Sequence, residues 1–376
     1  MDSKRPTIRD VAAAAGVAGS TVSRYLNGTL DLKLETAGRI DAAVAVTGYQ
    51  RPAGPANPAV PTADASPTAS AVSTAPTGRE PQRSSPVLGL IVPEALNQYF
   101  SQLVHELSQA AHRAGCELIV SIAFDQPARQ EALVDLFARF DLAGLFYIGT
   151  HHANPALARA LTDGLPVVVL DDEQAGLTRA TQIPATDLVV HDDYAGAFQA
   201  TSHLLRLGHR RIACVIGPDS LNSQSERLRG YSEALLTAGV DPHTQLIVRG
   251  PFTQNFGASA LPHILAHAPT PTPGFVTSDI IALGLLDVAR SMSVDVPGQL
   301  SVVGFDDAPL SRHLQPPLSS VHVSLREMAR TALDLMTARL TEPKTPPTRV
   351  VVPVTLATRA SSAAFAEPIT DPKGQP

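Results

Sequence analysis

Residues 7–28 read TIRDVAAAAGVAGSTVSRYLNG, and this stretch decides how the N-terminal part of the chain folds. Apolar residues recur at the i, i+3, i+4 and i+7 spacing of one helix face, at Ile8, Val11, Ala12 and Ala15. Thr7 stands where an N-cap belongs, Asp10 follows three residues later, and Gly16 suits a left-handed C-cap. The first half of the stretch therefore predicts one short amphipathic helix.

Two more short helices are expected after Gly16, the second of them over residues 34–47. Their apolar faces are formed by Val22, Tyr25 and Leu26 in one and by Ile40, Ala43, Val44 and Thr47 in the other. Three short helices with a tight glycine-containing turn between the first two are typical of a helix-turn-helix bundle. We therefore predict an all-α head over residues 1–51.

Residues 52–86 have a different composition, PAGPANPAVPTADASPTASAVSTAPTGREPQRSSP, rich in Pro, Ala, Ser and Thr and without Leu, Ile, Phe or Met. A segment of this kind cannot bury enough apolar area to offset the entropy that ordering it would cost. We expect a disordered, partly extended linker that tethers the head to the rest of the chain.

From residue 87 onward, continuous apolar runs alternate with amphipathic helical patterns. The runs are VLGLIV, CELIVSIA, LAGLFYIG, PVVVLD, RIACVIG, TQLIVRG, GFVTSD and LSVVGFD. Continuous apolar runs are expected for strands covered on both faces, and the alternation predicts α/β doubly wound sheets. We expect two similar subdomains, one of residues 87–185 and 309–340 and the other of 186–308 and 341–358, followed by a tail over 359–376. Ligands bind such folds in the cleft that faces the carboxyl ends of the strands.

The composition restricts the class of protein further. Hydrophobic residues make up 44% and charged residues 17% of the 376 residues, no apolar run is long enough to span a bilayer, and the N-terminus has no secretory pattern. Cys116 and Cys214 fit no metal or redox spacing, so we expect buried thiols in a cytoplasmic protein. The net charge is −6, but residues 1–51 hold seven Lys or Arg against five acidic residues. A mildly basic head on an acidic body is compatible with a head that binds a polyphosphate.

Signatures of catalysis are absent from the sequence. There is no GxSxG, P-loop or HExxH motif, and the adjacent His151 and His152 form a poor metal pair. Four acidic residues at expected strand ends look like catalytic pairs but suit helix capping better: Asp192, Asp193, Asp306 and Asp307. We expect no enzyme, no cofactor and no metal site.

Taken together, these patterns resemble the lactose/galactose-repressor (LacI/GalR) family of transcriptional regulators. The head matches the family's helix-turn-helix signature almost position by position over residues 7–28. The matching stretches of the body are LGLIVPEALNQYFSQL, HDDYAGAFQATSHLLRLGHRRIACVIG, ERLRGYSEAL, TSDIIALGLL and VPGQLSVVGFDDAPL. The likeness covers residues 6–51 and 87–358, and it implies a sensor domain with the fold of periplasmic sugar-binding proteins.

The resemblance implies the residues that contact DNA. The second helix is then the recognition helix, whose small residues allow close entry into the major groove. Base-reading positions fall on Gly19, Ser20 and Arg24. Phosphate-contact positions fall on Thr21, Ser23 and Asn27, and Thr7 joins this DNA-binding set. A solvated helix surface is the alternative for Arg24, and a guanidinium that binds a guanine edge is the stronger expectation.

The chain departs from the family at three places. Ala18 stands where the family has a serine N-cap for the recognition helix, which costs on the order of 1 kcal/mol of helix stability. Lys33 and Ala37 occupy positions of the third helix where the family has Ser and Arg. The linker is some twenty residues longer than the usual hinge and lacks the leucine that relatives insert into the minor groove.

The resemblance also implies a pocket for a small sugar-like effector, lined by Asn97, Asp171, Arg227, Phe252 and Asp279. Carboxylates accept from paired hydroxyls, a guanidinium donates to neighbouring oxygens, and an aromatic ring stacks on the apolar face of a pyranose. Two alternatives stay open, because Asp171 could instead cap a helix and Phe252 could instead pack a loop.

The sequence therefore predicts a cytoplasmic, DNA-binding transcriptional regulator, a repressor, with a sugar-like effector and double-stranded operator DNA as partners. A homodimer is expected because one short helix reads only half of a palindromic site. The tail after residue 357 has no leucine heptads, so no coiled coil is expected. The alternatives are a sugar-binding protein and a sugar-modifying enzyme on the same α/β fold.

Overall fold

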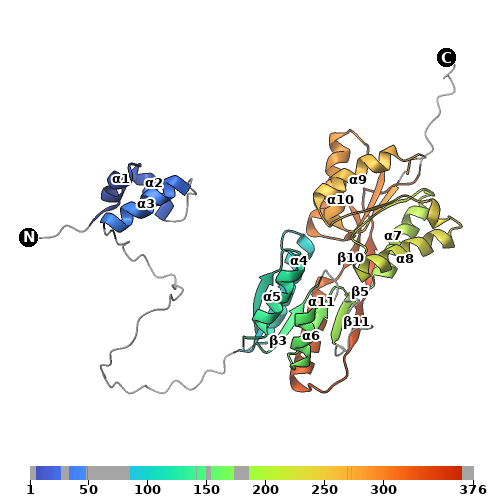
Figure 1. Cartoon of the computed structure of the whole chain (residues 1–376). Helices are drawn as coiled ribbons and strands as arrows, with labels where there is room; N and C mark the ends of the chain where they lie inside the picture. The colour runs from blue at the N-terminus through green and yellow to red at the C-terminus, as the bar shows by residue number, and fades with distance from the viewer. Residues whose placement is uncertain are drawn as a thin grey trace, which may run out of the picture. The chain divides into compact units, whose positions relative to one another are not determined.

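The computed structural model describes residues 6–26, 34–47, 49, 85–140, 142–149, 154–172, 186–268, 270–271 and 273–365. The chain divides into two compact units, residues 1–78 and 79–376, each with its own core (Figure 1). Asn27, the pair His151 and His152, and the linker predicted over 52–86, apart from its last two residues, lie outside the described residues. Within the described ranges, no helix has the length and apolar character needed to cross a membrane.

The first unit contains the three predicted helices, α1 (Ile8–Ala15), α2 (Gly19–Leu26) and α3 (Leu34–Thr47). Their buried side chains meet in a small core formed by Val11, Ala12, Ala15, Val22, Ile40 and Ala43. Each of these residues lies on the helix face that the apolar spacing predicts. The all-α head is therefore confirmed over its described part.

Local polar contacts fix the turn between α1 and α2. The backbone N–H and the hydroxyl of Thr7 both donate to Asp10 Oδ2, each at 2.7 Å, and Gly16 ends α1 with φ 62°. Arg39 of α3 donates to the carbonyl oxygens of Ala15 at 2.5 Å and Gly16 at 3.2 Å. This guanidinium satisfies carbonyl groups that the end of α1 leaves without partners, so α3 holds the turn in place.

The second unit contains two six-stranded sheets. All strand pairs of the first sheet are parallel, in the order β11 (Arg349–Val352), β5 (Asp187–His191), β4 (Val167–Leu170), β3 (Gly144–Tyr147), β1 (Val87–Val92) and β2 (Glu117–Ile122). Apolar side chains of the sheet pack on both faces. One face is covered by α4 (Gln98–Arg113) and α11 (Leu325–Thr341), and the other by α5 (Pro127–Phe137) and α6 (Pro155–Thr162).

The second sheet has the order β12 (Val354–Ala357), β10 (Ser319–Val323), β9 (Ser301–Asp306), β8 (Pro273–Val276), β6 (Ala213–Ile216) and β7 (Ile247–Arg249). Only β12 runs antiparallel to its neighbour. The covering helices are α7 (Asp193–Arg206) and α8 (Asn222–Thr237) on one face and α9 (Gln254–Ala266) and α10 (Asp279–Ser291) on the other. Two short 3-10 turns, η1 (Pro242–Thr244) and η2 (Pro309–His313), complete the subdomain.

The chain passes between the two sheets three times, after β5, after β10 and after β11. Figure 1 shows the consequence, since α11 and β11 from the last part of the chain lie with the green elements of the first subdomain. The predicted boundaries need correction: the first subdomain extends to residue 191, residues 309–323 belong to the second, and β11 belongs to the first. The physical reason is that β5, β10 and β11 contain polar residues and lack the long apolar runs by which the other strands were predicted.

Strand β2 also differs from expectation. It is the edge strand of its sheet, and Ile119 and Val120 are 46% and 37% exposed, so it is not covered on both faces.

Of the two free thiols, Cys214 is buried, which raises its pKa to about 12, whereas Cys116 is only half-buried.

Candidate functional site

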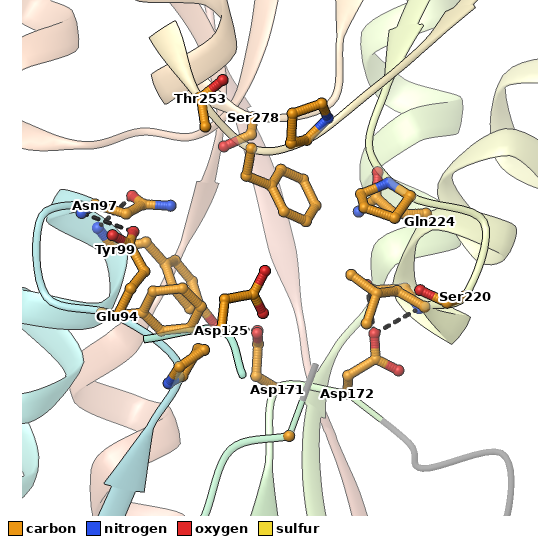
Figure 2. Close-up of a pocket in the computed structure, with 18 of the residues that line it drawn as sticks. Glu94, Asn97, Tyr99, Asp125, Asp171, Asp172, Ser220, Gln224, Thr253 and Ser278 are labelled. Carbon is orange, nitrogen blue, oxygen red and sulfur yellow. Dashed lines mark hydrogen bonds between the residues drawn. The ribbon is translucent and has the colours of Figure 1, made fainter. Parts of the chain in front are cut away.

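A cavity of about 410 Å³ lies between the two sheets of the second unit (Figure 2). Its walls are the loops that follow the carboxyl ends of strands in both subdomains, as expected for this class of fold. Figure 2 shows polar side chains ringed around the open space, among them Asn97, Asp125 and Asp171 from the first subdomain and Gln224, Thr253 and Ser278 from the second.

Three phenylalanine rings, in addition to Tyr99, contribute apolar surface to the cavity: Phe100, Phe124 and Phe252. The ring of Phe252 occupies space that a side chain at Gly217 would need, because a Cβ there would lie 2.5 Å from the ring. Gly217 therefore lets Phe252 pack beside the end of β6. A ring in this place suits the apolar face of a ligand.

Arg227, from α8, is the only cationic residue among those that line the cavity. Its side chain is buried, and Nε donates to Asp193 Oδ1 at 2.8 Å while Nη1 donates to the carbonyl oxygen of Thr277 at 2.5 Å. The guanidinium also lies 3.7 Å from the centre of the Phe305 ring, in cation–π geometry. Burial raises the pKa of Asp193 to about 7, although the neighbouring Arg227 acts to lower it.

Asp171 and Asp306 line the cavity from the ends of β4 and β9. Both have left-handed backbone conformations, with φ 73° and 110°, which non-glycine residues adopt at a cost of about 1–3 kcal/mol each. The Tyr99 hydroxyl donates to Asp171, and the Ser278 hydroxyl donates to Asp306 at 2.8 Å. Burial raises the pKa of both carboxyl groups, that of Asp306 to about 7.

Tyr99 is held in turn by a buried histidine. His191 Nε2 lies 3.2 Å from the Tyr99 hydroxyl, and burial lowers the pKa of this imidazole to about 3, so it is neutral. Because Tyr99 donates to Asp171, the imidazole N–H donates to Tyr99. His191 and Tyr99 together orient the Asp171 carboxylate.

Asp172 connects the two subdomains. Its carboxylate accepts from the backbone N–H of Asn222 at 3.1 Å and from the N–H and hydroxyl of Ser223 at 3.2 and 2.7 Å. It therefore caps the N-terminus of α8 from the other subdomain, since Leu221 at the N-cap position has no capping group. Burial raises the pKa of Asp172 to about 7.

In the first unit, α2 presents a surface of small and polar side chains. Ser20 and Arg24 are exposed, while Gly19, Thr21 and Ser23 are half-buried. A side chain at Gly19 would enter open space, because a Cβ built there has no neighbouring atom within 4 Å. Packing therefore does not explain the glycine, whereas close approach of another molecule would.

The comparisons with known proteins assign both units. Residues 7–52 match the lacI family of bacterial regulatory proteins, and residues 201–362 match the periplasmic binding protein-like domain. The HTH-type transcriptional regulator CelR of Thermobifida fusca is 31% identical over 358 residues, which cover 95% of this chain and 98% of CelR. The chain belongs to the lacI family. It is a DNA-binding transcriptional regulator with a helix-turn-helix head and a two-subdomain α/β sensor.

Solved structures agree with this assignment. The CelR–cellobiose complex aligns with a TM-score of 0.67 and 28% identity, covering 95% of this regulator and all of that chain. The lac repressor dimer bound to operator aligns with a TM-score of 0.65 at 23% identity, covering 96% of this chain. The HTH-type repressor CytR of Escherichia coli K12 is 28% identical over 331 residues, or 88% of each chain.

Four of the five predicted effector residues of this lacI-family regulator line the cavity: Asn97, Asp171, Arg227 and Phe252. Asp279 does not line it. Its carboxylate accepts from the Ala308 N–H at 3.0 Å, from the Ser320 hydroxyl at 2.7 Å and from the Ser311 hydroxyl. The preceding residue, Ser278, lines the cavity instead.

The expected caps have mixed outcomes. Asp192 caps α7, because its carboxylate accepts from the Ala195 N–H at 2.9 Å. The prediction was wrong for Asp193, which pairs with Arg227, and for Asp307, which pairs with Arg359 at 2.6 Å. Asp306 accepts from the Asp279 N–H at 3.3 Å and also lines the cavity.

Sequence reasoning missed several functional candidates, chiefly Tyr99, Asp172, Gln224 and Asp306. Asp306 is the last residue of β9, and Asp172 follows β4 closely. Tyr99 and Gln224 lie in the first turn of the helix that follows a strand. A position at or just after the carboxyl end of a strand is the signal that could have found them. Among the described residues, no group of three or more His, Cys, Asp or Glu is placed to hold a metal ion.

Proposed function

We propose that this regulator is a repressor whose cavity binds a small sugar and whose α2 reads an operator. The observation that carries the proposal is the cavity itself, where carboxylates, a guanidinium and aromatic rings meet between the two subdomains. CelR, the relative at 31% identity, has a solved complex with cellobiose, which supports a saccharide for this chain as well.

The chemistry of the lining suits a pyranose. Carboxylates such as Asp171 accept from two neighbouring hydroxyls, and the Asn97 amide can both donate and accept. The Phe252 ring offers a stacking surface for the C–H face of a sugar ring. Asn97, Asp171, Arg227 and Phe252 are therefore the proposed effector contacts, and Asp279 acts as a positioning residue behind Ser278.

For DNA, we place α2 in the major groove. Gly19, Ser20 and Arg24 then face base edges, and Thr7, Thr21 and Ser23 lie at the groove margins near phosphates. Asn27 belongs to the same expectation but lies outside the described residues. A regulator that binds operator DNA works in the cytoplasm, and the helix-turn-helix head favours this function over a sugar-binding protein or an enzyme.

The proposal is tested by fluorescence anisotropy with the full chain and DNA from upstream of its own gene. We expect preference for one palindromic site over a scrambled duplex of equal length and composition. A saccharide from a panel that includes cellobiose should then lower that affinity. Equal binding of both duplexes would contradict operator recognition, whereas an unchanged affinity across the panel would contradict a sugar effector.

Edge strand β2 is the proposed dimer surface. Its exposed Ile119 and Val120 form an unblunted apolar edge, which invites pairing with a second copy. We expect Ile119→Asp to give monomers in size-exclusion chromatography with light scattering, and to weaken operator binding about 100-fold through loss of bivalence. Val351→Asp is the matched control, because Val351 is exposed on the opposite edge strand, β11. A dimeric Ile119→Asp protein would place the interface elsewhere.

A further inference from the structure

The lining of the effector cavity is unbalanced in charge. Among the described residues that line it, Arg227 is the single cation, and none of them is a lysine or a histidine. Against it stand five acidic residues: Glu94, Asp125, Asp171, Asp172 and Asp306. The described lining therefore presents five carboxyl groups to one cation, and an anionic ligand would add to the cost of ionising those carboxyl groups whose pKa burial raises.

The one guanidinium is already engaged. Two of its nitrogens donate to Asp193 and to the Thr277 carbonyl, and its face rests on Phe305. An anionic ligand group would have to compete with Asp193, whose carboxylate is buried with it. Arg227 thus stabilises the protein's own carboxylates, and its Nε is not available for a side-on bidentate pair with a phosphate or carboxylate.

The helix N-termini around the cavity are occupied in the same way. Such termini are ready anion sites because their N–H groups point outward. The first N–H groups of α8 are bound by Asp172, the Asp279 N–H of α10 by Asp306, and the Asn97 N–H before α4 by Glu94 at 2.8 Å. The N-termini of α4, α8 and α10 thus already hold carboxylates, and that of α9 is capped by the Thr253 hydroxyl, which accepts from the Phe256 N–H at 3.1 Å.

Two carboxylates in the lining, those of Asp171 and Asp306, can still accept hydrogen bonds from a ligand. Asp171 Oδ2 and Asp306 Oδ1 accept no hydrogen bond from another described residue, whereas the second oxygen of each is engaged by Tyr99 or Ser278. The left-handed backbone at both residues holds them in the cavity lining. Oxygens of this kind are complemented by ligand hydroxyls, which donate, and are repelled by ligand anions.

We propose that the cavity selects its effector by charge, accepting an uncharged, hydroxyl-rich ligand and rejecting its phosphorylated or carboxylated forms. The proposal rests on the proposed sugar-sensing function and narrows it. A kinase or an oxidase that acts on the sugar would then end the signal, so the regulator reports the sugar before either reaction consumes it.

The test is isothermal titration calorimetry of the full chain with matched pairs of probes that keep the pyranose rings: cellobiose against cellobiose 6′-phosphate, and glucose against glucuronate and glucose 6-phosphate. The neutral member of a pair should bind, and its anionic partner should bind at least about 100-fold more weakly. Asp306→Asn should reduce the ratio of the neutral probe's affinity to the anionic probe's affinity about tenfold, because it removes one carboxyl group that repels the anion. Asp287→Asn is the matched control, since Asp287 is exposed on α10 and pairs with Arg290.

The outcomes separate the two proposals. Equal or tighter binding of an anionic probe would overturn charge selection and leave sugar sensing intact. Binding of no probe, neutral or anionic, would count against sugar sensing itself and against charge selection with it. If Asp306→Asn does not fold, as judged by its circular dichroism melt, Asp171→Asn supplies the same comparison, and an unchanged ratio there would contradict the proposal.

Discussion

Replacing Arg227 by methionine should abolish the effector response and lower the free energy of unfolding of the sensor by about 3–5 kcal/mol. The substitution leaves Asp193 buried without its cation and deprives the Thr277 carbonyl of a donor. A buried charge that has lost its partner is far more costly than the pair was favourable, because water cannot solvate it. Urea unfolding followed by circular dichroism measures the first effect and calorimetry with the saccharide the second.

Arg229→Met is the matched control for that experiment. Arg229 lies on the same helix and pairs with Glu226 at 2.5 Å, but its side chain is 55% exposed, so the loss should stay below about 1 kcal/mol. A double variant, Arg227→Met with Asp193→Asn, should recover part of the lost stability, since neither charge then stays buried alone. If the two single arginine variants unfold alike, the ion pair with Asp193 does not stabilise the sensor.

Arg24→Ala should remove the preference for the operator over scrambled DNA while leaving weak, salt-sensitive binding. A bidentate contact between arginine and guanine is worth about 1–3 kcal/mol of discrimination, and a dimer makes it twice. Competition anisotropy at two salt concentrations separates the loss of a base contact from the loss of a phosphate contact. Loss of a phosphate contact weakens binding to all DNA sequences alike and changes its salt dependence. Arg113→Ala, on the exposed surface of α4, is the control. Undiminished operator preference in Arg24→Ala would show that this side chain does not read bases.

Sequence patterns predicted the head well because its determinants are local. The capping pair Thr7 and Asp10, the left-handed Gly16 and the apolar spacing all act within one or two helical turns. The eight apolar runs of the sensor likewise became strands; six of them are covered by helices on both sides and so are apolar throughout, whereas β2 and β7 are partly exposed edge strands. Ala18 directly precedes α2, where relatives have a serine N-cap. Its carbonyl oxygen still accepts from the N–H groups of Thr21 and Val22, so the helix forms without the side-chain cap.

The misses arise from contacts between distant parts of the chain. Strands β5 and β10 are the last strands before the chain crosses to the other subdomain, β11 joins its sheet directly after such a crossing, and their short sequences, such as SSVHV, carry no strong pattern. Asp172 was missed because its partners, Asn222 and Ser223, are about fifty residues away. Asp279 was predicted to line the cavity, but neighbouring residues at the start of a helix point in different directions, and Ser278 lines it instead.

The open space beside Gly19 makes operator preference easy to change during evolution. At Gly257, in contrast, an added Cβ would lie 1.9 Å from the Ile281 carbonyl oxygen, so packing in the sensor prohibits change there. At Gly19 no described atom of the head lies within 4 Å of an added Cβ, so a single mutation can add a base contact without disturbing the three-helix core. After a gene duplication, one copy of this regulator could therefore acquire a different set of target genes while its sensor and its response to the effector stayed the same.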